Sequence, residues 1–277
     1  MRASALPDVV RRYRRLGYRQ LAASVAARGM LPVLEPVLRT RMAPSFRQVV
    51  AAGHATGTAG GFVQALLGEE AAPASRIAAL ADDFALATDL LAARYAAADP
   101  GCPTDWVVGD RSALALHLLV RLTRPDVVVE TGVAGGHSSF LLLSALEANG
   151  HGRLVSFDVL PHAGGLVPPQ LRSRWELVIL RSADPLAEAA ARVSAIGAVD
   201  VFFHDADHSY VGQYSDYAVA EKALRRGRLG ILVSDDIDMS FAFIEYVRSR
   251  QLDAAMLVDV GKVLGGCMVT RTARAGP

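Results

Sequence analysis

The chain has 277 residues, 52% of them hydrophobic, which is enough to bury a large core. One α/β domain with a helical extension is therefore expected, rather than two independent domains. Lysine and arginine total 29 against 28 aspartate and glutamate residues, and the formal net charge of +1 provides no global field to recruit nucleic acid or an anionic membrane.

Cysteine content and hydropathy predict an intracellular protein. Cys102 and Cys267 lie far apart in the sequence, and they form neither a CxxC pair nor a disulfide framework. No run reaches the ~18 uninterrupted apolar residues of a membrane span, and residues 1–30 lack the short apolar core and cleavage site of a signal peptide. The expected location is the reducing cytoplasm.

The first third of the chain predicts helices. Residues 6–98 are rich in alanine and leucine at helical spacing, interrupted by prolines and by GHATGTAGG (53–61), which we interpret as a flexible linker or lid. The segment AADPGCPTDW (97–106) breaks the helical pattern, because Asp-Pro-Gly and Cys-Pro end helices. We therefore expect a helical cap and oligomerisation region at 1–104, supporting a homodimer or higher homo-oligomer, and a second region at 105–277.

After this break, short β-branched runs alternate with helical segments. Continuous apolar runs of this kind are typical of parallel strands covered on both faces. Two last runs, 255–261 and 265–271, are separated by only a short turn-rich stretch and predict an antiparallel hairpin. The fold expected is a doubly wound, Rossmann-like, seven-stranded α/β sheet, with five parallel strands followed by this hairpin. The five parallel runs are DVVVE (126–130), RLVSFD (153–158), WELVIL (175–180), VDVFFH (199–204) and GILVSD (230–235).

A glycine-rich turn, ETGVAGGHSS (130–139), follows the first predicted strand. Its glycines let the backbone turn tightly and approach a ligand, and its serines open a helix whose free N–H groups can hold an anionic group. Asp158 ends the second strand, where an acceptor is well placed for ribose hydroxyls. Strand, turn, helix, strand and acid in this order predict a site for a nucleoside-bearing cofactor. The glycines and the first serine are Gly132, Gly135, Gly136 and Ser138.

The spacing G-x-x-G-G, with Glu130 before the first glycine, resembles motif I of class I S-adenosylmethionine-dependent methyltransferases. Their seven-stranded sheet also ends in an antiparallel hairpin, and the resemblance covers residues 112–271. It implies that Glu130 and the glycine turn hold the methionine part of S-adenosylmethionine and that Asp158 holds the ribose. It also implies that RSAD (181–184), including Ser182, forms the adenine edge.

Carboxylates cluster after two later strands. Asp205 and Asp207 follow the fourth strand, and Asp235 and Asp236 follow the fifth. Adjacent parallel strands lie only ~4.8 Å apart, so these acids would repel each other unless a cation lay between them. Oxygen ligands favour Mg²⁺, Ca²⁺ or Mn²⁺ over zinc. The alternative is that the acids cap the following helices or pair with arginine.

D-x-x-H (205–208) followed by D-D (235–236) resembles the metal-dependent O-methyltransferase branch, which includes macrolide-sugar enzymes and cephamycin-cluster relatives. The resemblance implies that Asp205, Asp235 and Asp236 bind Mg²⁺ or Mn²⁺. We expect His208 to take the acceptor proton, because an imidazole with pKa ~6.5 is mostly neutral in the cytoplasm. Catechol and caffeoyl-ester enzymes have Lys and Asn in place of His208 and Asp236, a difference that points towards sugar or polyketide hydroxyls.

The function predicted is an S-adenosylmethionine- and divalent-metal-dependent O-methyltransferase that acts on a hydroxyl of a small molecule, a secondary metabolite. Two alternatives remain open. One is a non-methylating relative, associated with hydroxylation or regulation, that keeps the fold and the metal. The other is a nicotinamide-dependent oxidoreductase, which leaves the glycine spacing, the hairpin and the acid cluster unexplained. The N-terminal helices and the segment around Tyr210, Tyr214 and Phe241 are expected to contact the acceptor.

Overall fold

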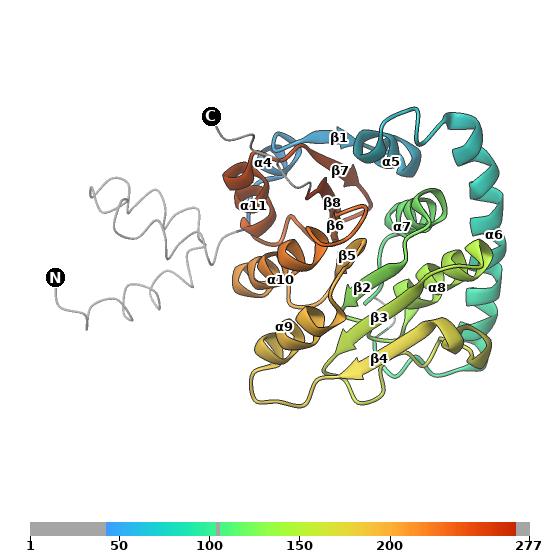
Figure 1. Ribbon diagram of the computed structural model, residues 1–277. Helices are drawn as coiled ribbons and strands as arrows, with labels where there is room; N and C mark the ends of the chain where they lie inside the picture. Colours follow the sequence, from blue (N-terminus) through green and yellow to red (C-terminus); the bar gives the residue numbers. More distant parts are fainter. Residues whose placement is uncertain (1–42, 104–105, 270–277) are drawn as a thin grey trace.

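A computed structural model describes residues 43–103 and 106–269, so the first 42 residues of the predicted cap lie outside the described part of the chain. These residues form an eight-stranded sheet in the order β1-β7-β8-β6-β5-β2-β3-β4 (Figure 1). The strands are β1 (His54–Thr56), β2 (Val127–Thr131), β3 (Arg153–Asp158), β4 (Trp175–Ile179), β5 (Val201–His204), β6 (Ile231–Ser234), β7 (Ala254–Val258) and β8 (Val263–Met268).

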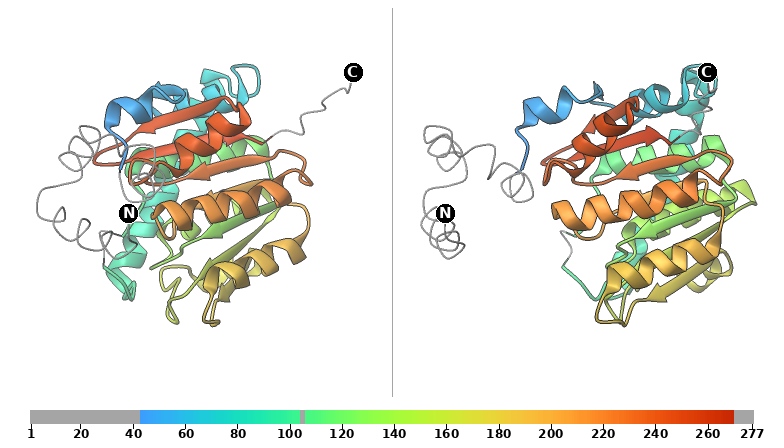
Figure 2. Two further views of the ribbon diagram at one scale, coloured as in Figure 1. Left: turned by 90° about the vertical axis from the view of Figure 1, so that its left-hand side faces the viewer. Right: turned by 60° about the vertical axis from the view of Figure 1, so that its left-hand side comes forward.

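Helices cover both faces of the sheet. One layer contains α5, α6, α7 and α8, and the other contains α9, α10 and α11 (Figures 1 and 2). Within the described ranges, no helix is both long and apolar enough to cross a bilayer. The helical segments are α4 (Phe46–Val50), α5 (Ala59–Leu67), α6 (Ala74–Ala97), α7 (Asp110–Thr123), α8 (His137–Asn149), the 3₁₀ segment η2 (Pro169–Arg174), α9 (Pro185–Ile196), α10 (Tyr210–Leu224) and α11 (Ala242–Arg250).

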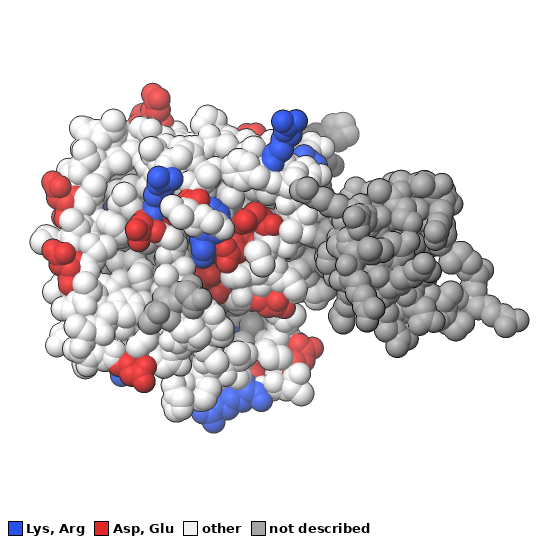
Figure 3. All heavy atoms as spheres, turned by 180° about the vertical axis from the view of Figure 1, so that it is seen from behind, with Lys and Arg blue, Asp and Glu red and all other residues white. Residues whose placement is uncertain are grey.

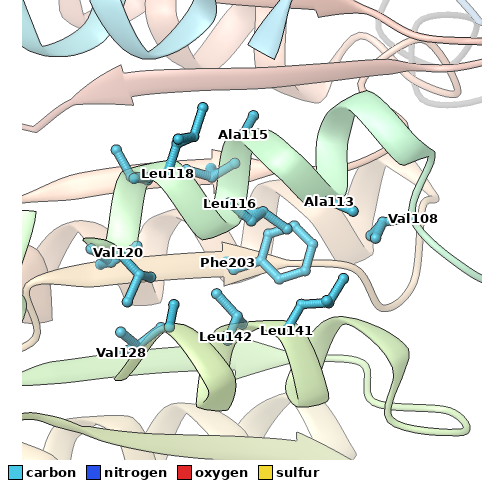
Figure 4. Close-up of a cluster of buried hydrophobic side chains, with 14 of the residues drawn as sticks. Val108, Ala113, Ala115, Leu116, Leu118, Val120, Val128, Leu141, Leu142 and Phe203 are labelled. Atoms are coloured by element: carbon cyan, nitrogen blue, oxygen red, sulfur yellow. The ribbon is translucent and has the colours of Figure 1, made fainter. Parts of the chain in front are cut away.

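The apolar runs of the central strands build two cores, one on each side of the sheet. Successive strand residues point to opposite faces, so Val128 and Phe203 join the α5–α8 layer, whereas Val129 and Phe202 join the α9–α11 layer. Figure 4 shows side chains of α7 and α8 pointing toward Val128 and Phe203. Burial on both faces explains why these runs lack the polar alternation of a half-exposed strand.

The predicted doubly wound Rossmann-like fold is confirmed, including the antiparallel β7–β8 pair. The strand count differs by one. His54–Thr56 pairs in parallel with β7, although we expected residues 53–61 to be a linker or lid, and α5 begins within the same segment at Ala59. Because this edge strand has three residues, none of them buried, its sequence gives no apolar signal.

The described part of the predicted N-terminal cap packs on the sheet. Helix α5 contacts α7, β7 and β8, and α6 contacts α7 and α8. Phe62 of α5 and Leu91 of α6 belong to the same core as Val128 of β2. Helices α5 and α6 are therefore part of one layer of the α/β body, whereas the predicted homo-oligomer stays a prediction.

The strand directions bring the candidate residues to one edge. Strands β2, β3, β5 and β6 are parallel, so their carboxyl ends meet. Strand β8 runs antiparallel to β6, with Ser234 opposite Gly265, and the residue before β8, Lys262, therefore reaches the same edge. Strand order reverses at β2, which lies between β5 and β3, and this is where a doubly wound sheet opens a ligand crevice.

Candidate active site

A cavity of about 780 Å³ lies at this edge of the sheet. Its lining is apolar beside β3, β4 and α9, where Phe157, Leu180 and Leu186 contribute, and charged beside β5 and β6, where His208 and Lys262 contribute. On the face shown in Figure 3, acidic side chains gather near the centre with basic side chains directly beside them. The size falls within the range of small-molecule sites. The two halves of the cavity can therefore hold chemically different parts of one or two ligands.

The glycine turn lies between these halves. Gly132, Ala134 and Gly136 all have positive φ angles, of 85°, 47° and 91°. The N–H groups of Val133 and Ala134 donate to Oδ2 of Asp158, at 2.7 and 2.8 Å. Asp158 therefore holds the turn in its unusual backbone conformation, and it also lines the cavity. Its expected contact with ribose hydroxyls stays a prediction.

Glu130 is buried within the fold, although we expected it to contact the methionine part of S-adenosylmethionine. Its side chain is fully buried and does not line the cavity. The hydroxyls of Ser138, Ser139 and Ser156 donate to its carboxylate, at 2.6, 2.6 and 2.7 Å. Glu130 therefore ties the start of α8 to β2 and β3. Ser138 does line the cavity, so Glu130 acts on the site by fixing this serine.

Three other residues expected to bind the cofactor also lie outside the cavity. A side chain at Gly135 would meet Pro100, and one at Gly136 would meet Gly164, so both glycines allow the 99–102 and 160–167 segments to pack closely. Ser182 is exposed, and its N–H donates to Glu188 at 2.9 Å. Leu180, Pro185, Leu186 and Ala189, which flank RSAD in the sequence, line the cavity and form its apolar slot.

The buried carboxyl of Glu130 predicts a pH-dependent stability. Burial raises the pKa of Glu130 to about 7, although the three serine hydrogen bonds act in the opposite direction. An acid whose folded pKa lies above its unfolded value loses stabilisation as pH rises through the folded pKa. Relative to Glu130→Gln, the wild-type unfolding free energy should fall by about 2 kcal/mol between about pH 5 and about pH 8, measured by urea denaturation. A pH-independent difference would show that Glu130 is ionised throughout.

An acid–imidazole group forms the charged half of the cavity. His208 Nε2 lies 3.4 Å from Oδ1 of Asp205, and Nδ1 lies 3.2 Å from Oδ2 of Asp236. Burial opposes protonation of His208, but its interactions with Asp205 and Asp236 outweigh this and raise its pKa. Asp236 has a left-handed backbone, with φ of 50°, which Asp tolerates better than most residues. The structure thus brings Asp205, His208 and Asp236 together.

Asp235 lies behind this group and contacts Lys262. Its side chain is fully buried and does not line the cavity, and Oδ2 accepts from Lys262 Nζ at 2.7 Å. Burial and the charge of Asp205 raise the pKa of Asp235, and Lys262 partly offsets them. Oδ1 makes no hydrogen bond within the described residues. Asp235 is therefore an acid that depends on Lys262 for its charge compensation.

Asp207 stabilises the start of the following helix, a role close to the helix capping that we considered as the alternative to metal binding. It lines the cavity, but its carboxylate accepts from the N–H and the hydroxyl of Ser209, both at 2.9 Å. Ser209 in turn caps α10 by accepting from the N–H of Gly212. Asp207 thus fixes the start of the helix that follows His208.

Two groups at the site escaped the sequence prediction. Thr131 donates to Asp216 at 2.7 Å, and Asp216 bonds to the buried His204 at 2.8 Å, so His204 is part of a polar network beside the cavity. Lys262 could have been singled out from the sequence. It is one of only two lysines among the 29 basic residues of the chain, and it directly follows Gly261 in the predicted hairpin turn.

Residues 129–237 match a family model described as a methyltransferase domain. The matched range begins in β2 and ends after Asp236, so it includes the glycine turn, Asp158 and the acid–imidazole group. The match lies within the predicted second region, residues 105–277, and covers less than half of the chain. The sequence matches no curated protein.

Two solved structures share the fold. An O-methyltransferase from Bacillus cereus, in complex with SAH, is 17% identical, with 66% of this chain and 90% of that chain covered and a TM-score of 0.50. A proposed O-methyltransferase from Klebsiella pneumoniae is 21% identical, with 66% and 89% covered and a TM-score of 0.50. At 17% and 21% identity, the similarity to these structures establishes the fold alone.

Proposed function

We propose that this protein is an S-adenosylmethionine-dependent O-methyltransferase that acts on a hydroxyl of a small molecule. The observation that carries the proposal is the two-sided cavity, with an apolar slot on one side of the glycine turn and an imidazole between two carboxylates on the other. The adenosine would occupy the apolar slot, and the acceptor would lie at the charged end. The SAH bound to the Bacillus cereus structure supports the choice of cofactor.

Methyl transfer requires a group that accepts the hydroxyl proton, and it requires the acceptor oxygen to be held in line with the methyl–sulfur bond. His208 takes the proton of the acceptor hydroxyl, the oxygen forms a bond to the methyl carbon, and the carbon–sulfur bond breaks to leave S-adenosylhomocysteine. His208 lines the cavity, and Asp205 and Asp236 orient its ring. The same carboxylates make the imidazole a stronger base, because they stabilise its protonated form.

The magnesium ion predicted from the sequence would be held by Asp205, Asp235 and Asp236. In the described residues no group of three or more His, Cys, Asp or Glu side chains is placed to hold a metal ion. Oδ2 of Asp235 already contacts the Lys262 ammonium at 2.7 Å. The residues as arranged do not fit a divalent ion, and the mechanism proposed here assigns no step to one.

The test is a methyl-transfer assay with the full chain, S-adenosylmethionine and a panel of sugar, polyketide and catechol hydroxyls. The expected result is release of S-adenosylhomocysteine together with an O-methylated product of matching mass. Cofactor binding without release, for every acceptor, would favour the non-methylating alternative. Binding of a nicotinamide dinucleotide, with no binding of S-adenosylmethionine, would favour the oxidoreductase.

Asp158→Ala tests the cofactor half of the cavity. Loss of this carboxylate removes the acceptor for the Val133 and Ala134 N–H groups and the expected acceptor for the ribose. Cofactor affinity should weaken by about 1.5–3 kcal/mol, measured by calorimetry with S-adenosylhomocysteine. Asp89→Ala, an exposed acid on α6, should bind normally. Unchanged affinity in Asp158→Ala would remove Asp158 from the cofactor site.

A further inference from the structure

The position of Lys262 is set by the turn between β7 and β8. Gly261 has a φ of 78°, and this left-handed residue directs the chain back into β8. Lys262 therefore enters the sheet edge from the antiparallel strand, opposite the acids that leave β5 and β6. The other lysine of the chain, Lys222, is exposed on α10.

The ammonium group of Lys262 lies among oxygen atoms. It donates to Oδ2 of Asp235 at 2.7 Å and to the carbonyl oxygen of Val107 at 3.2 Å, and Oδ1 of Asp236 lies 3.6 Å away. The Lys262 side chain is only 20% exposed, and that of Asp235 is fully buried. A shielded ion pair of this kind is screened little by solvent, so the attraction between the ammonium and the carboxylate is strong.

The chain itself supplies a cation to the acid cluster. Asp235 and Asp236 lie next to the Lys262 ammonium, and Asp205 and Asp236 lie next to the His208 imidazole, so Asp236 contacts both. Two carboxylates this close favour uptake of a cation, and here a lysine supplies it. A divalent ion at Asp235 and Asp236 would have to displace the ammonium or lie beside it against charge repulsion.

We propose that the Lys262 ammonium is the built-in cation of this site, pairing with Asp235 and Asp236 in place of a divalent metal ion. Lys262 is thus a positioning residue. It fixes Asp236, which contacts His208, and it leaves methyl transfer independent of added metal. The inference rests on the proposed function for its effect on activity, but its effect on metal binding can be measured without turnover.

Metal binding to the full chain is the first measurement. Wild-type protein titrated with Mn²⁺, with free Mn²⁺ followed by electron paramagnetic resonance, should bind no ion at this cluster up to about 1 mM. Lys262→Met, which removes the ammonium and keeps the side-chain bulk, should bind about one Mn²⁺ per chain, because Asp235 and Asp236 then lack their ammonium partner and can join Asp205 as oxygen ligands. Lys222→Met is the matched control and should behave as wild type.

A second measurement keeps the inference testable if Lys262→Met fails to fold. Wild-type methyl transfer should continue in EDTA at about its normal rate, and Lys262→Arg should fold and remain free of Mn²⁺. Wild-type binding of Mn²⁺ that is lost in Asp235→Asn would overturn the inference. Loss of wild-type turnover in EDTA, restored by Mg²⁺, would overturn it as well. Failure of turnover with every acceptor would count against the proposed function and leave the Mn²⁺ result decisive.

Discussion

His208→Ala is expected to lower kcat for methyl transfer by about 10²–10⁴-fold while leaving cofactor affinity nearly unchanged. Among the histidines of the described residues, His208 is the one held between two carboxylates, Asp205 and Asp236, at the cavity. Removal of the imidazole leaves the acceptor hydroxyl without its base. The glycine turn is held by Asp158 and not by His208, whose ion-pair partners are Asp205 and Asp236, so binding of S-adenosylhomocysteine should persist.

Imidazole rescue distinguishes a missing base from a damaged site. The alanine variant leaves room for a free imidazole, and added imidazole should restore part of the rate in a concentration-dependent way. His54→Ala, at an exposed position in β1, is the control and should keep wild-type kcat. Wild-type kcat in His208→Ala would assign proton removal to another group or to solvent.

The sequence carried enough information to predict the central sheet. Each parallel strand is a short run that must be apolar on both faces, and turns and helices of the expected length separate the runs. β3 was predicted at its observed residues, Arg153–Asp158, and the other central strands differ only at their ends. A three-residue edge strand such as β1 leaves no such pattern, because its residues are not buried.

The candidate site was predictable only in part, since strand ends reveal position but not side-chain direction. Asp205, His208 and Asp236 were placed together because parallel strands end at one edge. The same reasoning could not show that Glu130 points away from the cavity toward three serines. Nor could it show that Lys262, from the antiparallel strand, enters the acid cluster.

Gly132→Ala is expected to have the largest effect on both the fold and the cofactor site. Gly132 lies where β2 ends between β3 and β5, and its N–H donates to the carbonyl of Phe157 at 2.9 Å. Its φ is 85°, and a Cβ there would overlap the backbone carbonyl of Asp205. Left-handed strain and a backbone clash together should lower the unfolding free energy by about 3 kcal/mol or more.

The matched control separates the clash from the backbone conformation. Gly150, which ends α8, has a left-handed conformation with φ of 62° and ψ of 17°, and a Cβ there would meet no atom within 4 Å. Gly150→Ala should therefore lose only about 1–2 kcal/mol of unfolding free energy in urea, from the left-handed conformation alone. Gly132→Ala should lose more, and any folded fraction should bind S-adenosylhomocysteine at least ~10-fold more weakly, since relief of the clash moves Asp205 or the turn. Equal losses in the two variants, with normal cofactor binding, would show that the turn does not depend on contact with the β5 exit.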